Sequence, residues 1–279
     1  MQSWIAEKNI PHILLSGIAG TGKSSCINVL LHELDINPND VFQINASEET
    51  SVETVRTKIL NFASTIPFGD FKVCVLEEAD ALSKAAQRSL KRVIEDYTDN
   101  CRFIFTTNEP HRIDPALHSR LQQFHFEALD EESFIARMMY ILEDNNVTYD
   151  ADVLIAYVKA AYPDLRKAIG LLEQNSHGGT LMSPSSDNTS SIDYMVKVAE
   201  LFQKGKIQEA REVLTKQSTP EEYIEIYRFL YRNLSFWGNS SDKQDQALII
   251  IRDGLYKDSL VADREINLSA TLAQLAMME

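Results

Sequence analysis

The sequence predicts an α/β protein, with a parallel sheet in its N-terminal part and an all-helical C-terminal part. Between residues 11 and 128, short apolar runs typical of buried strands alternate with amphipathic helical patterns. From residue 129 onward, no convincing strand is present and apolar residues recur at helical spacing. Strands that alternate with helices favour a parallel sheet with helices on both faces.

Five strands, separated by helices, are expected in this sheet. The expected strands cover residues 12–16, 41–44, 71–76, 101–106 and 123–126. The expected helices cover residues 23–34, 51–65 and 83–97, with a shorter one near 115–121. Ligands of such sheets bind at the carboxyl ends of the strands, so we expect the functional site at that edge.

Beyond this sheet domain at residues 1–128, three segments are expected. Residues 129–176 form a small helical domain, with helices at 130–144, at 151–161 and after Asp164. Residues 177–191 are rich in Gly, Ser and Asn, which predicts a linker. Residues 192–279 form an all-helical domain with helices near 192–204, 207–216, 220–235, 242–257 and 263–278.

The composition excludes several classes of protein. The chain has 279 residues, 44% of them hydrophobic, and a formal net charge of −14. That charge excludes a surface coated with basic residues, so any nucleic-acid contact must come from a local patch. The three cysteines show no paired metal-ligand spacing, and no stretch approaches a membrane span or a signal peptide. We therefore expect a cytoplasmic protein with reduced cysteines and no membrane partner.

A glycine-rich segment between the first strand and the first helix carries the strongest functional signal. Two glycines separated by four residues, Gly17 and Gly22, are followed by Lys23 and Ser24, which is the P-loop pattern. Lys23 is expected to reach the β- and γ-phosphates of a nucleotide, and Ser24 to ligate Mg²⁺. A glycine-rich turn that binds nothing is the alternative. The predicted phosphate-binding residues are Gly17, Ala19, Gly20, Thr21, Gly22, Lys23, Ser24 and Ser25.

Two carboxylates follow the third expected strand. Glu77 and Glu78 end an apolar run, in the region where a P-loop ATPase needs acidic side chains. One is expected to support Mg²⁺ and the next to polarise the attacking water, so Glu77 is a candidate metal ligand and Glu78 a candidate base. An ordinary strand end with solvated acids is the alternative.

Three more polar side chains lie at positions that suit phosphate chemistry. Asn108 follows the fourth expected strand and is placed to hydrogen-bond the γ-phosphate or the attacking water. Arg120, on a short helix, is placed to reach the nucleotide of a neighbouring subunit. Arg166, at the start of a helix in the small helical domain, is placed to cover the nucleotide of its own subunit. A plain turn and two solvated arginines are the alternatives.

The helix expected at 83–97 has a basic face. Four basic residues and no acid occur between residues 81 and 94, and they fall within one arc of the helix, opposite an apolar stripe. A solvated basic face is the alternative to a binding surface for phosphates. The four residues are Lys84, Arg88, Lys91 and Arg92.

These motifs, in this order, resemble those of the AAA+ ATPases. Within that class they are most similar to subunits of sliding-clamp loaders, namely the small subunits of replication factor C and their tailed-phage counterparts. The resemblance spans about residues 11–175 and is carried by residues 17–24, 43–47, 76–80, 87–92, 107–108, 119–120 and 163–166. It implies a P-loop nucleotide-binding domain at 1–128, a helical lid at 129–176 and a collar at 192–279 that joins subunits.

The resemblance also implies an activity and partners. It implies a pentameric ring that binds ATP and Mg²⁺ between subunits, opens a sliding clamp, closes it around primer–template DNA and hydrolyses ATP to let go. Glu78 is then the catalytic base, Arg120 acts in trans, and Arg166 is the lid arginine. Asn45 holds Glu78 inactive until DNA binds, and the basic helix tracks the DNA backbone. A phage-encoded protein of this kind would act in the host cytoplasm.

The chain departs from the family pattern at three points. Glu77 replaces the usual Asp, and Leu121 stands where the family has Cys. The chain also begins only about ten residues before the first strand, which leads us to expect a truncated start, because family members carry a longer N-terminal segment at the adenine pocket. Two alternatives stay open: another AAA+ machine, such as a helicase loader or branch-migration motor, and a structural subunit that binds ATP without hydrolysing it.

Overall fold

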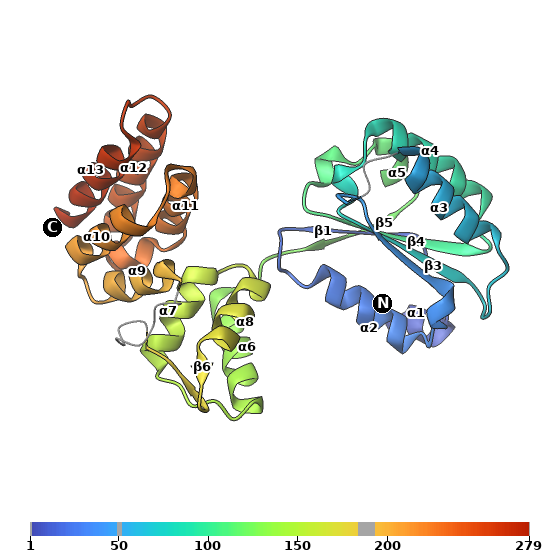
Figure 1. Ribbon diagram of the computed structural model, residues 1–279, viewed down its shortest axis with the longest axis horizontal. Helices are drawn as coiled ribbons and strands as arrows, with labels where there is room; N and C mark the ends of the chain where they lie inside the picture. The colour runs from blue at the N-terminus through green and yellow to red at the C-terminus, as the bar shows by residue number, and fades with distance from the viewer. Residues whose placement is uncertain (1, 49–51, 184–192, 279) are drawn as a thin grey trace. The chain divides into compact units, whose positions relative to one another are not determined.

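The five expected strands form one parallel sheet within Met1–Leu129, the first of two units into which the chain divides. In this computed structural model, which describes residues 2–48, 52–183 and 193–278, the strand order is β2-β3-β4-β1-β5 (Figure 1). All strand pairs are parallel, which confirms the predicted fold class. The strands are β1 (Ile13–Gly17), β2 (Val41–Asn45), β3 (Lys72–Glu77), β4 (Cys101–Thr107) and β5 (Gln122–Phe126).

Helices cover both faces of this sheet. Successive side chains of β3 point to opposite faces of the sheet. Val73 and Val75 pack with the α2 side chains, while Cys74 and Leu76 pack with those of α3 and α4. The first face carries α1 (Gln2–Glu7) and α2 (Lys23–Glu33), and the second carries α3 (Val52–Ser64), α4 (Lys84–Asp96) and α5 (Pro115–His118) (Figure 1). Short 3₁₀ turns occur at Pro38–Asp40, Ala79–Ala81 and Pro110–Arg112.

The second unit, Asp130–Glu279, is mainly helical. One hydrophobic core runs through it and contains side chains such as Tyr157 of α7 and Phe202 of α9. The two helical domains expected from the sequence therefore share buried surface, and their separation into lid and collar stays a prediction. The helices are α6 (Glu131–Asp144), α7 (Ala151–Ala161), α8 (Leu165–Gln174), α9 (Tyr194–Gln203), α10 (Ile207–Gln217), α11 (Tyr223–Arg232), α12 (Ser241–Asp258) and α13 (Arg264–Ala276), with 3₁₀ turns at Pro220–Glu222 and Leu234–Trp237.

A small hairpin occurs where the sequence predicted only a linker. β6 (Ser176–His177) and β7 (Thr180–Leu181) pair antiparallel around Gly178 and Gly179, whose φ angles are 62° and 76°. Positive φ at both turn positions is the requirement of a two-residue type I′ turn, which Gly meets without strain. The expectation that no strand follows residue 129 is therefore wrong here, because two-residue strands leave no periodic signal. Residues 184–191 of the predicted linker lie outside the described residues.

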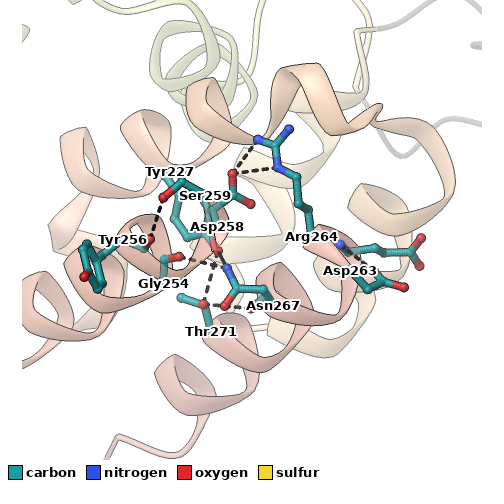
Figure 2. A network of polar contacts seen from close by, with 10 residues as sticks. Tyr227, Gly254, Tyr256, Asp258, Ser259, Asp263, Arg264, Asn267 and Thr271 are labelled. Atoms are coloured by element: carbon teal, nitrogen blue, oxygen red, sulfur yellow. Dashed lines mark hydrogen bonds and ion pairs between the residues drawn. The ribbon is translucent and has the colours of Figure 1, made fainter. Parts of the chain in front are cut away.

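A buried polar network joins the two C-terminal helices (Figure 2). The Asp258 carboxylate accepts hydrogen bonds from Nε and Nη2 of Arg264, at 2.8 and 2.5 Å, and so closes the turn between α12 and α13. Nδ2 of Asn267 donates to the Gly254 carbonyl oxygen and to the Tyr227 hydroxyl, both at 2.9 Å.

None of the helices in the described part of the chain has the length and apolar character that a membrane span requires.

Candidate active site

The glycine-rich segment forms a tight loop between β1 and α2. Gly20 and Gly22 have φ angles of 73° and 91°, in the left-handed region that glycine adopts without strain. At Gly17 the limit is space, since a Cβ there would lie 2.3 Å from the carbonyl oxygen of Phe126 in β5. Both kinds of constraint explain why glycine stands at these positions.

The N-terminus of α2 opens into this loop. Gly22 is the N-cap residue and has no side chain to satisfy the N–H groups of the first turn. Ser24 and Ser25 lie in that turn, and the Thr21 hydroxyl braces the loop by donating to the Ile18 carbonyl oxygen at 2.9 Å. Uncapped N–H groups and the positive end of the helix dipole form an anion site. The loop therefore fits the phosphates of a nucleotide.

Lys23 links the loop to the end of β4. Its side chain is buried, and Nζ donates at 2.8 Å to the carbonyl oxygens of Gly17 and Ile18 and to Oδ1 of Asn108. The structure thus brings together Lys23 and Asn108, which are 85 residues apart in the sequence. β1 and β4 are neighbours in the sheet, which is why their carboxyl ends meet.

Two acidic side chains follow the same edge on β3. Glu77 places Oε1 in a buried position with no hydrogen-bond partner among the described residues. A buried carboxylate oxygen without a donor is unusual, and it fits a cation ligand such as Mg²⁺. Glu78 is exposed and has φ 52° and ψ 44°, a left-handed conformation that is uncommon for a residue with a side chain. Strain of this kind concentrates at functional sites.

Asp80, which has no role predicted from the sequence, organises the end of β4. Oδ1 of Asp80 accepts hydrogen bonds from the Thr107 hydroxyl at 2.6 Å and from the Asn108 backbone N–H at 3.3 Å. The Thr106 hydroxyl accepts from the Glu78 N–H at 3.3 Å. The two threonines thus hold the backbone, and Asn108 is the strand-end side chain that reaches Lys23.

Asn45 lies at the end of β2, in register with Glu77, but its side chain turns to its own loop. Oδ1 accepts from the N–H of Ser47 at 3.1 Å and from its hydroxyl at 3.0 Å, and Nδ2 donates to Glu48 at 3.4 Å. The predicted contact between Asn45 and Glu78 is not among these hydrogen bonds. A switch role for Asn45 stays a prediction that needs a rearrangement of this loop.

The basic helix is α4, and its orientation follows the predicted pattern. Lys84, Arg88 and Arg92 are exposed and Lys91 is half-buried, while Ala86, Leu90 and Val93 are buried. Arg88 lies 3.5 Å from the carboxylate of Asp114, which also caps α5. The face is therefore available to phosphates, although two of its cations already lie near acids, since Arg92 is also 3.5 Å from the carboxylate of Asp96.

Gln87, on the buried side of α4, is a second residue without a predicted role. Its side chain donates to the carbonyl oxygens of Leu82 and Arg112, at 3.0 and 3.3 Å, and accepts from the Asp114 N–H at 2.6 Å. These bonds tie α4 to the start of α5. A Gln in an apolar helical stripe was the available signal in the sequence.

The two remaining arginines with predicted roles lie in different units. Arg120 follows α5 in the first unit and donates from Nε to Oε1 of Glu95 at 2.7 Å. Arg166 is exposed in the first turn of α8, in the second unit, after the N-cap residue Asp164. Their predicted roles both concern a bound nucleotide and stay predictions.

An exposed apolar loop precedes β3. Ile66 and Phe68 are 88% and 76% exposed, although both are large and apolar. The loop is held in place, because the buried carboxylate of Asp40 accepts from the N–H groups of Phe68 and Gly69 at 2.8–3.0 Å. An anchored loop that presents apolar side chains to solvent is typical of a protein-binding surface.

Comparison with known proteins identifies the family. Residues 13–128 match the model of the ATPase family associated with various cellular activities (AAA). The chain is 32% identical to the replication factor C small subunit of Methanococcus vannielii, over 100% of this chain and 92% of the relative. It is 31% identical to the replication factor C small subunit of Sulfurisphaera tokodaii, over 99% of this chain and 88% of the relative.

The chain belongs to the replication factor C small-subunit family of AAA ATPases. Solved structures agree on the fold. The RuvB Holliday junction branch migration motor of Thermotoga maritima superposes with a TM-score of 0.54 at 16% identity, over 81% of this chain and 73% of that one. A DNA polymerase III gamma subunit-related protein from the same organism gives 0.51 at 13% identity, over 99% and 98%. Both likenesses show the AAA+ fold alone.

Proposed function

We propose that this chain is an ATP-hydrolysing subunit of a sliding-clamp loader, which opens the clamp and loads it onto primer–template DNA. The similarity to replication factor C small subunits over the whole chain carries the proposal. That similarity extends past the AAA match at 13–128 into the helical second unit, so it concerns more than a nucleotide-binding core.

The residues at the sheet edge have the chemistry that hydrolysis needs. Lys23 and the N–H groups of the loop bind phosphate oxygens, with Lys23 exchanging its present carbonyl partners for them. Ser24 and Glu77 hold Mg²⁺, which neutralises phosphate charge when bound. Glu78 takes the proton of the attacking water, and Asn108 orients that water or the γ-phosphate.

The test of this proposal is Glu78→Gln in the assembled complex. The change keeps the shape of the side chain and removes the base, so turnover should fall by on the order of 10²–10⁴-fold while ATP binding persists. Lys23→Ala is the matched comparison and should lose ATP binding as well. If Glu78→Gln hydrolyses ATP at the parent rate, the assignment of Glu78 as the base is overturned. If the parent itself does not hydrolyse ATP, the result favours a subunit that uses ATP only to hold the ring together.

The proposal includes partners. Arg120 acts on the nucleotide of the next subunit and Arg166 on that of its own, within a ring of five subunits. The helices of residues 192–279 join the subunits, and the basic face of α4 contacts the DNA backbone. We place this machine in the cytoplasm. The relatives reported above come from Methanococcus vannielii and Sulfurisphaera tokodaii and give no support to a phage source.

The exposed loop gives the clamp a docking surface in this proposal. Ile66 and Phe68 protrude from an anchored backbone. They therefore enter an apolar pocket of a partner with little loss of conformational entropy in the loop. Phe68→Ser should weaken binding to the sliding clamp in a pull-down while leaving ATP binding unchanged. Val29→Ser, at an exposed apolar position of α2, is the control, and equal clamp binding by both variants would exclude the loop.

A further inference from the structure

Arg120 is held by its own subunit. Its Nε donates to Oε1 of Glu95 at 2.7 Å, and Nη2 contacts the same oxygen. Nη1 donates to the Ala116 carbonyl oxygen at 2.7 Å and to the Ser119 hydroxyl at 3.0 Å. The three nitrogens of the guanidinium therefore each have a partner on α4 or α5, and its charge is neutralised by Glu95.

The ion pair between Arg120 and Glu95 can open at a small cost in free energy. The side chains of Arg120 and Glu95 are 28% and 47% exposed, so water and salt screen their attraction. Exposed pairs of this kind contribute little to stability, and a phosphate carries more charge than one carboxylate. A nucleotide presented by a neighbouring subunit therefore competes well with Glu95 for the guanidinium.

We propose that Glu95 is a positioning residue for Arg120. It holds the guanidinium against its own subunit, and Arg120 turns to the neighbour's nucleotide when this contact opens. The inference rests on the proposed function, in which Arg120 acts in trans. It adds a residue that decides how much of the time Arg120 is available, and hence how fast the ring hydrolyses ATP before DNA arrives.

The place of Glu95 on α4 gives this contact a second consequence. α4 also carries the basic face, and its Arg88 lies 3.5 Å from Asp114, the N-cap residue of α5. The segment from Asp114 to Arg120 is thus held by ion pairs with α4 at both ends. DNA phosphates that draw Arg88 away from Asp114 loosen one of these attachments, which links DNA binding to the release of Arg120.

The experiment compares Glu95→Gln with Asp96→Asn in the assembled complex without DNA. Both remove one negative charge from the last turn of α4, but Asp96 pairs with Arg92, at 3.5 Å, and not with Arg120. Glu95→Gln should raise basal ATPase activity by about 2- to 5-fold, because an exposed pair restrains its members by no more than that. It should also reduce the further stimulation by DNA, whereas Asp96→Asn should leave basal activity near the parent value.

A double-mutant cycle separates this role from a structural one. In an Arg120→Ala background, Glu95→Gln should have no effect on the rate, because the residue acts through Arg120. A rise that persists without Arg120, a fall, or a rate equal to the parent would each overturn the proposal, and thermal unfolding of both single variants checks that the fold is kept. If Arg120→Ala alone leaves the rate unchanged, the trans assignment itself fails, and Glu78→Gln then tests independently whether the chain hydrolyses ATP.

Discussion

Asp80 shows how one side chain positions another at the sheet edge. Its Oδ1 accepts from the Thr107 hydroxyl and the Asn108 N–H, and Asn108 in turn accepts from Lys23. We predict that Asp80→Ala lowers the kcat of the assembled ATPase by about 10-fold or more with little change in ATP affinity, because small displacements of a reacting geometry are costly. Steady-state kinetics with a nucleotide-binding titration measures both.

The matched variants for this prediction are Asp80→Asn and Asn108→Ala. Asp80→Asn keeps an acceptor oxygen and should lose less activity than Asp80→Ala. If Asp80 acts through Asn108, the double variant should be about as slow as Asn108→Ala alone. Fully additive losses would mean that Asp80 serves the fold or the metal instead.

His12 makes the stability of the first unit depend on pH. Its Nδ1 accepts the Phe103 N–H at 3.1 Å, and burial together with the charge of Arg102 lowers the pKa of His12 to about 4. Since the unfolded value is about 6.5, the unfolded chain binds more protons between these values. The stability contributed by neutral His12 is therefore fully present above about pH 6.5 and is lost as the pH falls toward 4.

Denaturant unfolding at about pH 7.5 and about pH 5 checks this. The parent should lose more free energy of unfolding between these pH values than His12→Gln, whose amide oxygen still accepts from Phe103 and does not titrate. His32→Gln, at a histidine whose side chain is 87% exposed, should behave like the parent. An equal loss in parent and His12→Gln would contradict the assignment.

At the residue scale, the sequence indicated the backbone turn of the contiguous motif and missed the contacts between distant residues. The P-loop is one stretch, and Gly20 and Gly22 have the positive φ angles of the tight turn that its pattern predicts. The partner of Arg120 is 25 residues away on α4, and that of Asp80 is 27 residues away on β4, so both depend on strand order and helix packing that no local pattern encodes. Asn45 was assigned a partner by resemblance, and the structure gives its side chain another.

The basic face of α4 leads to a prediction at the scale of one element. Lys91→Ala should lower DNA-stimulated ATPase activity far more than basal activity, and should weaken DNA binding about equally across sequences, because its contacts are to phosphates. The slope of DNA affinity against salt concentration should decrease by the amount that corresponds to about one phosphate contact. Lys8→Ala, an exposed cation before β1, is the control, and identical DNA responses of Lys91→Ala and the parent would leave α4 as a solvated face.

The pairing of α12 with α13 depends on one glycine. A Cβ at Gly254 would lie 2.3 Å from the Thr271 hydroxyl oxygen, and Gly254 also supplies the carbonyl that Asn267 binds (Figure 2). Gly254→Ala should therefore destabilise the second unit by about 1–3 kcal/mol through overpacking. Thermal unfolding measures the loss. Gly170→Ala, in α8 where nothing lies within 4 Å of the added carbon, should not destabilise, and equal melting of both variants would contradict this account.

Helices and strands were predictable from the sequence where they are long enough to show the spacing of their apolar residues. The strands of the sheet were expected within a few residues of their observed bounds, because buried strands between glycine and proline turns form distinct apolar runs. The β6–β7 hairpin was missed, since its strands are two residues each and its Gly178-Gly179 turn resembles a linker.

At the scale of the whole molecule, the shared core of the second unit constrains how assembly can be tested. Tyr157 of α7 and Val198 of α9 belong to the same buried cluster, and the Tyr157 hydroxyl donates to the Met182 carbonyl oxygen at 3.0 Å. Removing residues 192–279 would expose the buried side of α7. A truncation would therefore mix loss of assembly with loss of folding, and surface substitutions are the sharper probe.

The outer side of α12 offers such a probe. Ile249 and Tyr256 are 55% and 67% exposed and are seven residues apart, so they lie two helical turns apart on one stripe of the helix. An exposed apolar stripe on a folded helix is typical of a surface that packs against another chain. We predict that Ile249→Ser together with Tyr256→Ser shifts the complex toward free subunits in sedimentation velocity, while the isolated subunit keeps its melting temperature and ATP binding. The exposed Val29→Ser in the first unit is the control; unchanged assembly of the double variant would show that subunits join through another surface.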